Sequence, residues 1–196
     1  MVALGRVCVF CGSSTPPDPR YADLARSLGA LLADRGTEVV YGGRRVGLMG
    51  QLADAALEAG GRVIGVLPVA LAELEIAHSG LSELHRVGTM HERKALMYDL
   101  ADGFVALPGG LGTLDELAEV ATWSQLGLHR KPIVLLDVDR YWAALLDQLD
   151  RMVATGFVRQ ANRELLHWAA SPQEAVAVLE TARPEAVQGW IDPDQR

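Results

Sequence analysis

The 196-residue sequence predicts an α/β fold in which helices cover both faces of a doubly wound parallel β-sheet. Two observations predict it: short segments alternate with longer segments of helical periodicity, and the short segments are apolar almost throughout. Strands of a parallel sheet are buried on both faces, so they form continuous apolar runs. The sequence contains no internal repeat and no interdomain linker, so one such sheet is expected.

In the first 68 residues, three strands are expected to alternate with two helices. The strands are RVCVF (6–10), TEVVYGG (37–43) and GRVIGVLP (61–68). The helices span 20–36 and about 48–59, and the first carries its leucines on one face. Residues 69–88 are less regular, and no element is assigned to them.

The rest of the chain continues the alternation. Helices are expected at 90–100, 114–128, 141–156 and 171–181, and strands at 103–110, 131–137 and 165–171. The last helix opens with a capping box, Ser171 to Glu174, and has proline at its first position. We expect residues 1–182 to form a single domain and 183–196, which contain two prolines and a glycine, to form a loose tail.

Composition excludes several classes of protein. Hydrophobic residues make up 49% of the chain, which is typical of a globular protein, and no apolar run is long enough to span a membrane. The formal net charge of −7 argues against binding to a nucleic-acid backbone. The amino terminus resembles a first strand rather than an export signal, so a cytoplasmic protein is expected.

Neither the cysteines nor the histidines form a recognisable metal or redox site. Cys8 and Cys11 lie in and just after an apolar strand, where positions three apart point to opposite faces, so we interpret them as buried residues. The segment HERKA has Ala95 where a zinc-binding H-E-x-x-H helix needs histidine, and the histidines show no ligand spacing. No metal and no cofactor are expected.

Three glycine-rich loops leave the carboxyl ends of expected strands: CGSST (11–15), YGGRRVGLMG (41–50) and PGGLGT (108–113). Ligands bind at this edge of a parallel sheet, where glycine lets backbone amides approach a phosphate. Ser13, Ser14 and Thr113 add hydroxyl donors. The loops match neither the P-loop nor the dinucleotide fingerprint, so the site is expected to take a mononucleotide or another small phosphorylated ligand.

Thr113 and Glu116 spell T-x-x-E, and two interpretations remain open. In one, Glu116 is only the second half of a capping box. In the other, Glu116 faces the ligand together with Arg93, which lies on the helix at 90–100. A carboxylate and an arginine beside a phosphate loop suit hydrolysis of a glycosidic bond in a nucleotide. Arginine stays protonated, so Arg93 is not a general base.

The segments PGGLGTLDE (108–116) and MHERK (90–94) together resemble the Lonely Guy family, formerly labelled lysine decarboxylases. The likeness extends over about the first 180 residues. It implies a Rossmann-like fold, a homodimer, and hydrolysis of N6-modified adenosine 5'-monophosphates, with plain AMP as a further substrate, to free base and ribose 5-phosphate. Arg93 and Glu116 match the family's catalytic pair.

The resemblance and the glycine loops together define the candidate substrate-binding residues. These are Gly12, Ser13, Gly43, Glu75, Lys94, Gly109, Gly110, Leu111, Gly112, Thr113, Leu114, Asp115 and Thr122. Among them, Glu75 lies in a segment that departs from the plant-like pattern, and Asp115 is expected to be solvated or to interact with the helix dipole.

The sequence bears on three further interpretations. A non-catalytic nucleotide sensor or carrier needs the loops but not the pair Arg93 and Glu116. A pyridoxal-dependent decarboxylase needs a lysine for its Schiff base, and the sequence has only Lys94 and Lys131, the second at the start of a strand. Trp123, Leu126 and Leu128 fit either the core or a dimer interface.

Overall fold

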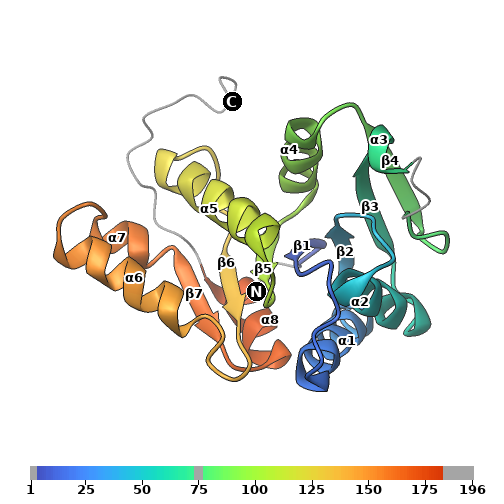
Figure 1. The fold of residues 1–196 in the computed structure, drawn as a ribbon, viewed down its shortest axis with the longest axis horizontal. Coiled ribbons are helices and arrows are strands. Elements are labelled where there is room, and N and C mark those ends of the chain that lie inside the picture. Colours follow the sequence, from blue (N-terminus) through green and yellow to red (C-terminus); the bar gives the residue numbers. More distant parts are fainter. Residues whose placement is uncertain (1–3, 73–76, 183–196) are drawn as a thin grey trace.

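Seven strands form one parallel sheet in the computed structural model, which describes residues 4–72 and 77–182. In chain order they are β1 (Arg6–Phe10), β2 (Glu38–Tyr41), β3 (Val63–Pro68), β4 (Glu83–Val87), β5 (Gly103–Ala106), β6 (Ile133–Leu136) and β7 (Leu166–Ala169). Their order across the sheet is β4-β3-β2-β1-β5-β6-β7, as Figure 1 shows. The strand order therefore reverses between β1 and β5.

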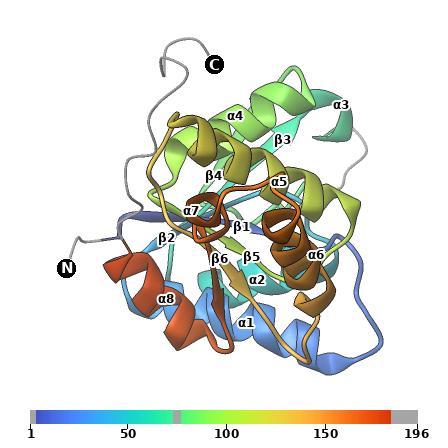
Figure 2. The same ribbon diagram turned by 90° about the vertical axis from the view of Figure 1, so that its left-hand side faces the viewer.

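Helices cover both faces of the sheet. On one face lie α1 (Pro19–Asp34), α2 (Gly47–Glu58) and α8 (Pro172–Thr181), and on the other lie α4 (Met90–Leu100), α5 (Leu111–Leu126) and α6 (Ala143–Ala154) (Figure 2). Two short helices, α3 (Val69–Ala72) and α7 (Gln160–Arg163), complete the set in the described residues. The predicted doubly wound α/β fold is confirmed.

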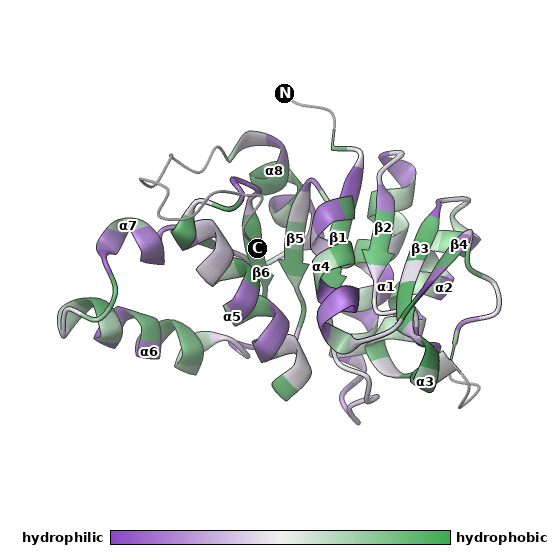
Figure 3. Ribbon diagram, turned by 90° about the horizontal axis from the view of Figure 1, so that it is seen from above, coloured by the Kyte–Doolittle hydropathy of each residue, from purple (hydrophilic) through white to green (hydrophobic). Residues whose placement is uncertain are grey.

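The strands form the centre of the core. Every side chain of β3, β5 and β6 is buried, and Figure 3 shows mostly hydrophobic colouring along the central strands. Phe10 of β1 stacks on Phe104 of β5 at 5.8 Å, and Tyr98 of α4 meets both rings edge-on. Such contacts add to the roughly 1.5–3 kcal/mol that burial of each large apolar side chain contributes.

All predicted helices and strands are present, with ends that differ by a few residues. The capping box at the start of α8 is confirmed, because Glu174 N–H donates to Ser171 Oγ at 3.2 Å. Cys8 and Cys11 are buried free thiols, as predicted, and burial raises the pKa of both. No helix in the described ranges is long and apolar enough to cross a membrane. The division into a domain at 1–182 and a tail stays a prediction, since 183–196 lie outside the described residues.

The sequence does not predict β4, α3 or α7. The strand β4 has the polar sequence ELHRV and pairs only with β3, so it lies at the edge of the sheet and lacks the apolar pattern of a buried strand. The helices α3 and α7 are single turns of four residues, too short to show a helical period. The edge position of β4 and the short length of α3 and α7 therefore explain why the sequence did not predict these three elements.

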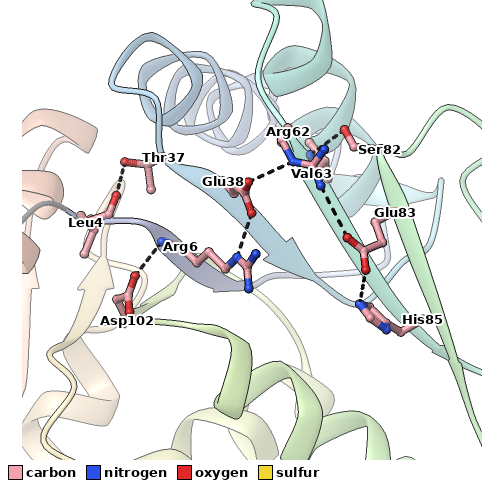
Figure 4. A network of polar contacts seen from close by, with 10 residues as sticks. All are labelled: Leu4, Arg6, Thr37, Glu38, Arg62, Val63, Ser82, Glu83, His85 and Asp102. Carbon is pink, nitrogen blue, oxygen red and sulfur yellow. Dashed lines mark hydrogen bonds and ion pairs between the residues drawn. The ribbon is translucent and has the colours of Figure 1, made fainter.

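Ion pairs connect the amino ends of the first four strands, as Figure 4 shows. Glu38 binds Arg6 at 2.8 Å and Arg62 at 2.9 Å, and Glu83 binds Arg62 at 3.5 Å and His85 at 2.9 Å. Their side chains are 24–55% exposed, so each pair contributes at most about 1 kcal/mol. This charged edge is opposite to the edge where the glycine loops leave the sheet.

The turn after β6 places two consecutive non-glycine residues, Asp139 and Arg140, at positive φ angles of 57° and 59°. Asp139 is held there by an ion pair with Arg20 at 3.0 Å. For Arg140 this backbone conformation is unfavourable, and glycine adopts it without steric strain.

Arg140→Gly is expected to raise the free energy of unfolding by about 0.5–1 kcal/mol, because the relieved strain exceeds the added entropy of the unfolded chain. The melting temperature should rise by about 2 °C. Thermal unfolding checks this, with Arg130→Gly as the control, since Arg130 is exposed but has a negative φ. Equal or lower stability of Arg140→Gly would contradict the assignment of strain.

Candidate functional site

The three glycine loops meet around a cavity of about 530 Å³ at the carboxyl edge of the sheet. Gly12–Ser14 follow β1, Gly42 follows β2, and Gly109–Thr113 follow β5 and begin α5. Gly12 N–H donates to the carbonyl of Pro108 at 3.3 Å, which joins the loops on either side of the strand-order reversal. The volume lies in the usual range for a small-molecule site, and the location is where such sheets bind ligands.

The amino terminus of α5 opens into this cavity without a side-chain cap. Gly110 is the N-cap, and the first intrahelical bond runs from Leu114 N–H to its carbonyl at 3.1 Å. The amides of Leu111, Gly112 and Thr113 therefore lack helical partners, and the helix dipole adds a partial positive charge there. An anionic group such as a phosphate is the ligand these features favour.

The capping-box interpretation of Thr113 and Glu116 is wrong, and so is the idea that Thr113 caps the helix. Gly110 is extended, and α5 begins at Leu111, three residues before the predicted start. Thr113 is therefore the third helical residue. The T-x-x-E that caps a helix is Thr89 to Glu92, at the start of α4, where Glu92 N–H donates to Thr89 Oγ1 at 3.1 Å.

Gly109 is held from two sides. A Cβ at this position would lie 2.1 Å from Thr113 Oγ1, so only glycine fits against the helix. On the other side, the hydroxyl of Tyr141 donates to the Gly109 carbonyl, and Tyr21 packs edge-on against the Tyr141 ring at 5.9 Å. Because a trans peptide points its N–H away from its C=O, this bond also sets the direction of the Gly110 amide.

Arg93 and Glu116 form a buried ion pair on the cavity wall. Arg93 Nη1 lies 2.9 Å from Glu116 Oε1, and the two side chains are 7% and 6% exposed. Arg93 Nε also donates to the Val66 carbonyl of β3 at 3.1 Å. The pair therefore joins α4, α5 and the sheet, and both residues line the cavity, as the sequence predicted for a catalytic pair.

The environment of Glu116 alters its acidity. Burial raises the pKa of the Glu116 carboxyl, and the guanidinium of Arg93 opposes the rise without cancelling it. A carboxyl with a raised pKa beside a fixed cation in a cavity is typical of catalytic sites.

Gly42 is required by the position of Arg93. A Cβ on Gly42 would lie 2.0 Å from Arg93 Nη2, and Arg93 cannot easily move, because Glu116 and Val66 hold it. Gly43 is among the candidates that the sequence predicts, and Gly42 is not. Glycine is needed at position 42 because a side chain there would collide with Arg93, which is 51 positions later in the sequence. No local sequence pattern reveals such a contact.

Lys94 does not line the cavity and instead connects α4 to α5. Its Nζ lies 3.1 Å from Asp115 Oδ2 and 3.1 Å from Glu119 Oε2, and Tyr98 donates to Glu119 at 2.9 Å. Burial lowers the pKa of Lys94, but the two carboxylates outweigh burial, so the pKa is raised overall. Asp115 is exposed as expected, lines the cavity and is also bound to Lys94.

Eight predicted binding residues besides Arg93 and Glu116 line the cavity: Gly12, Ser13, Gly109, Gly110, Leu111, Gly112, Thr113 and Asp115. Gly43, Leu114 and Thr122 do not. Gly43 is buried and accepts a backbone hydrogen bond from His78, Leu114 packs on the core, and the Thr122 hydroxyl donates to the carbonyl of Ala118. Glu75 lies outside the described residues.

Several lining residues were missed by the sequence analysis. They are Arg44 in the loop after β2, the aromatic pair of Tyr21 and Tyr141, and an apolar group comprising Met49, Leu67, Leu71 and Met90. The loop that contains Arg44 was predicted to bind the ligand, so Arg44 could have been predicted as a binding residue from the sequence. The others come from four different helices, one strand and one turn, and carry no shared signal.

The two lysines of the chain are both engaged away from the cavity. Lys94 is held between two carboxylates, and Lys131 Nζ donates to the carbonyl of Tyr98 at 2.7 Å. A Schiff base needs a lysine amine within the site. This arrangement does not fit a pyridoxal-dependent decarboxylase.

Leu128 is part of the core, and Trp123 packs partly against it, so a place for Trp123 in a dimer interface stays a prediction. Trp123 is half-buried and meets Tyr98 edge-on at 5.2 Å, and Leu128 is 9% exposed. Leu126 is also half-buried.

Comparison with known proteins identifies the family. A family model described as "Possible lysine decarboxylase" matches residues 49–179. The chain is 47% identical over 180 residues to cytokinin riboside 5'-monophosphate phosphoribohydrolase LOG7 of Arabidopsis thaliana, which covers 92% of this chain and 83% of that protein. The chain belongs to the Lonely Guy (LOG) family. It is also 47% identical over 174 residues to the LOG-family cytokinin riboside 5'-monophosphate phosphoribohydrolase of Rhodococcoides fascians, with 88% of each chain covered.

Solved structures share the fold of this LOG-family chain. The molybdenum cofactor binding protein of Rippkaea orientalis superposes with a TM-score of 0.70 at 24% identity, covering 90% of this chain and 96% of that one. The protein TM1055 superposes with a TM-score of 0.69 at 27% identity, covering 91% and 99%. At 24% identity, the likeness to the molybdenum cofactor binding protein concerns the fold alone.

Gly42→Ala is expected to displace the Arg93 guanidinium and break its bond to Glu116, since the new methyl group occupies its place. Overpacking of this kind lowers the free energy of unfolding by about 1–3 kcal/mol. A crystal structure and thermal unfolding of the variant check both effects.

Gly112→Ala is the matched control, because a Cβ at Gly112 meets nothing within 4 Å and alanine favours a helix. Its stability should be equal or higher. An unmoved Arg93 in Gly42→Ala would contradict the proposed reason for glycine at this position.

Proposed function

We propose that this protein hydrolyses the N-glycosidic bond of N6-modified adenosine 5'-monophosphates, and of AMP, to free base and ribose 5-phosphate. One observation carries the proposal: a buried arginine–carboxylate pair lines the same cavity as an uncapped helix amino terminus. The relatives named as cytokinin riboside 5'-monophosphate phosphoribohydrolases support the same reaction.

The spacing on α5 suits a ribose 5-phosphate. The free amides lie at the first turn, at Leu111 to Thr113, and Glu116 follows Leu111 by five residues. A helix rises 1.5 Å per residue, so the backbone of Glu116 lies roughly 4.5–7.5 Å along the helix axis from these amides. That separation is about the length of ribose 5-phosphate, so a phosphate bound at the turn brings the anomeric carbon close to Glu116.

Glu116 and Arg93 then have distinct tasks. The Glu116 carboxylate stabilises the oxocarbenium-like centre that forms as the bond breaks, or orients the attacking water. Arg93 holds this carboxylate in place through the 2.9 Å bond and stabilises charge on the reacting groups. Arg93 stays protonated and takes no part as a base.

The alternative is a nucleotide sensor or carrier. The fold does not decide, since the molybdenum cofactor binding protein of R. orientalis has the same architecture. A carrier has no need of a buried carboxylate whose pKa is raised beside a fixed guanidinium. Burying such a group is unfavourable, and catalysis is the reason that best accounts for it.

Glu116→Gln is expected to lower kcat for AMP and for isopentenyladenosine 5'-monophosphate by about 10³-fold, because the neutral amide does not stabilise positive charge. Dissociation constants for ribose 5-phosphate should change little, since the amides of α5 remain. Free base and ribose 5-phosphate are quantified by chromatography, and binding is measured by calorimetry.

Glu119→Gln is the control on the same helix, where the side chain binds Lys94 and Tyr98 and does not line the cavity. It should keep nearly full kcat. If the wild type binds AMP and releases no base from either nucleotide, the carrier interpretation replaces the proposed reaction.

The raised pKa of Glu116 predicts the pH dependence. Activity requires the ionised carboxylate, so kcat should fall as pH falls, with a midpoint above 4.5, the ordinary value for glutamate. The measurement is kcat at saturating AMP, because the substrate phosphate, with its second pKa near 6, also affects kcat/KM. Glu119→Gln should give the same midpoint. A midpoint at or below 4.5 would contradict the role given to Glu116.

A homodimer and a cytoplasmic location stay predictions. Two apolar side chains at the cavity rim, Met90 and Leu111, are 47% and 85% exposed and would be covered if a second copy docked there. Light scattering of the purified protein determines the oligomeric state.

A further inference from the structure

Arg44 presents a buried donor, its Nε atom, that has no hydrogen-bond partner in residues 4–72 and 77–182. The residue follows β2 and lines the cavity, and its Nε atom is buried without a hydrogen bond. Arginine stays protonated, so this donor is permanent. Buried donors in folded proteins are nearly always paired, so a guanidinium with an unpaired nitrogen, on a residue that lines a cavity, points to an acceptor on a ligand.

The two arginines of the cavity differ in their contacts. Arg93 is held by Glu116 and by the Val66 carbonyl, so much of its donor capacity is already used. For Arg44, the structure shows no ion pair with any residue in 4–72 or 77–182. Arg44 is therefore the cavity arginine with donors left for a ligand.

Arg44 lies on the β2–β3 side of the cavity. Its backbone pairs with Ala77, and the carbonyl of the preceding Gly43 accepts from His78 at 3.0 Å. The wall on this side includes Leu67, at the end of β3, and Leu71, in α3. The uncapped turn of α5 is on the other side, beside the β1 loop, because β5 and β1 are neighbours.

This placement separates the two ends of a bound nucleotide. With the phosphate at the α5 turn and the anomeric carbon at Glu116, the base extends toward β2 and β3. Arg93 lies along this direction, because its side chain bonds to Glu116 at one end and to the Val66 carbonyl of β3 at the other. The base end then has apolar contacts from Leu67 and Leu71 and a free donor on Arg44.

We propose that Arg44 binds the base, its guanidinium donating to an acceptor nitrogen of a purine ring. The inference rests on the proposed function, which supplies the position of the phosphate and the ribose. It assigns Arg44 as a specificity-determining residue for purine nucleotides. A purine has acceptor nitrogens at N1, N3 and N7 as well as a flat face for the apolar side chains.

The test compares a ligand that has a base with one that lacks it. In a Glu116→Gln background, which prevents turnover, calorimetry measures the binding of AMP and of ribose 5-phosphate with and without Arg44→Met. We expect AMP to bind about tenfold more weakly in the Arg44 variant, as for one hydrogen bond to a charged donor. Ribose 5-phosphate should bind within twofold of its original affinity.

Arg45→Met is the matched control, because Arg45 is the next residue, is exposed and does not line the cavity. It should leave both affinities unchanged. Arg44→Lys keeps the charge but lacks the planar guanidinium, so AMP binding should stay weak. Full rescue by lysine, or an equal loss for ribose 5-phosphate, overturns the assignment and makes Arg44 a charge partner of the phosphate.

Deaza analogues identify the acceptor. One of 1-deaza, 3-deaza and 7-deaza AMP should bind the Arg44-containing protein about tenfold more weakly than AMP, and the Arg44→Met protein should not distinguish that analogue from AMP. If none of the three analogues shows this difference, Arg44 does not donate a hydrogen bond to a ring nitrogen. A failure of the proposed function is seen separately, as absence of base release by the wild type that binds AMP normally.

Discussion

The buried ion pair of Arg93 and Glu116 is the interaction on which the site depends. It crosses from α4 to α5, and its hydrogen bond to Val66 fastens both helices to the sheet. Taking two charges out of water is unfavourable unless geometry and hydrogen bonds compensate. Here the compensation is supplied by the short pair distance, by the carbonyl of β3, and by Lys94, which links the same two helices through Asp115 and Glu119.

The pair also shows that the site is kept at some expense of stability. The folded protein raises the pKa of Glu116, so between pH 4.5 and the raised value it binds more protons than the unfolded chain. The free energy of unfolding therefore decreases as pH rises through this window. A neutral residue at position 116 would avoid this penalty. The presence of Glu116 is therefore consistent with selection for chemistry rather than for stability.

The two edges of the sheet serve different purposes. At the amino edge, partly or fully exposed charges such as Glu38 and Arg62 pair with one another and contribute little individually. At the carboxyl edge, backbone amides of the α5 turn and the Nε donor of Arg44 have no hydrogen-bond partner among the described residues. Unpaired donors there are the physical basis for placing the phosphate at one end of the cavity and the base at the other.

The sequence by itself determined the α/β fold, the central strands, the three glycine loops and the pairing of Arg93 with Glu116 as candidates. Strong apolar periodicity and local turn chemistry carry those features, so neighbouring residues suffice. Local sequence was misleading at Thr113, because the conformation of Gly110 moves the start of α5 and turns an apparent cap into a helix interior.

Only the tertiary structure decided which donors and side chains meet. Gly42 is needed for Arg93, Tyr141 orients Gly109, and Lys94 binds across to α5 instead of entering the cavity. Each of these contacts joins residues more than 20 positions apart, and their meeting follows from the strand order rather than from any local pattern. The same is true of Arg44, whose missing partner is visible only once the cavity is assembled.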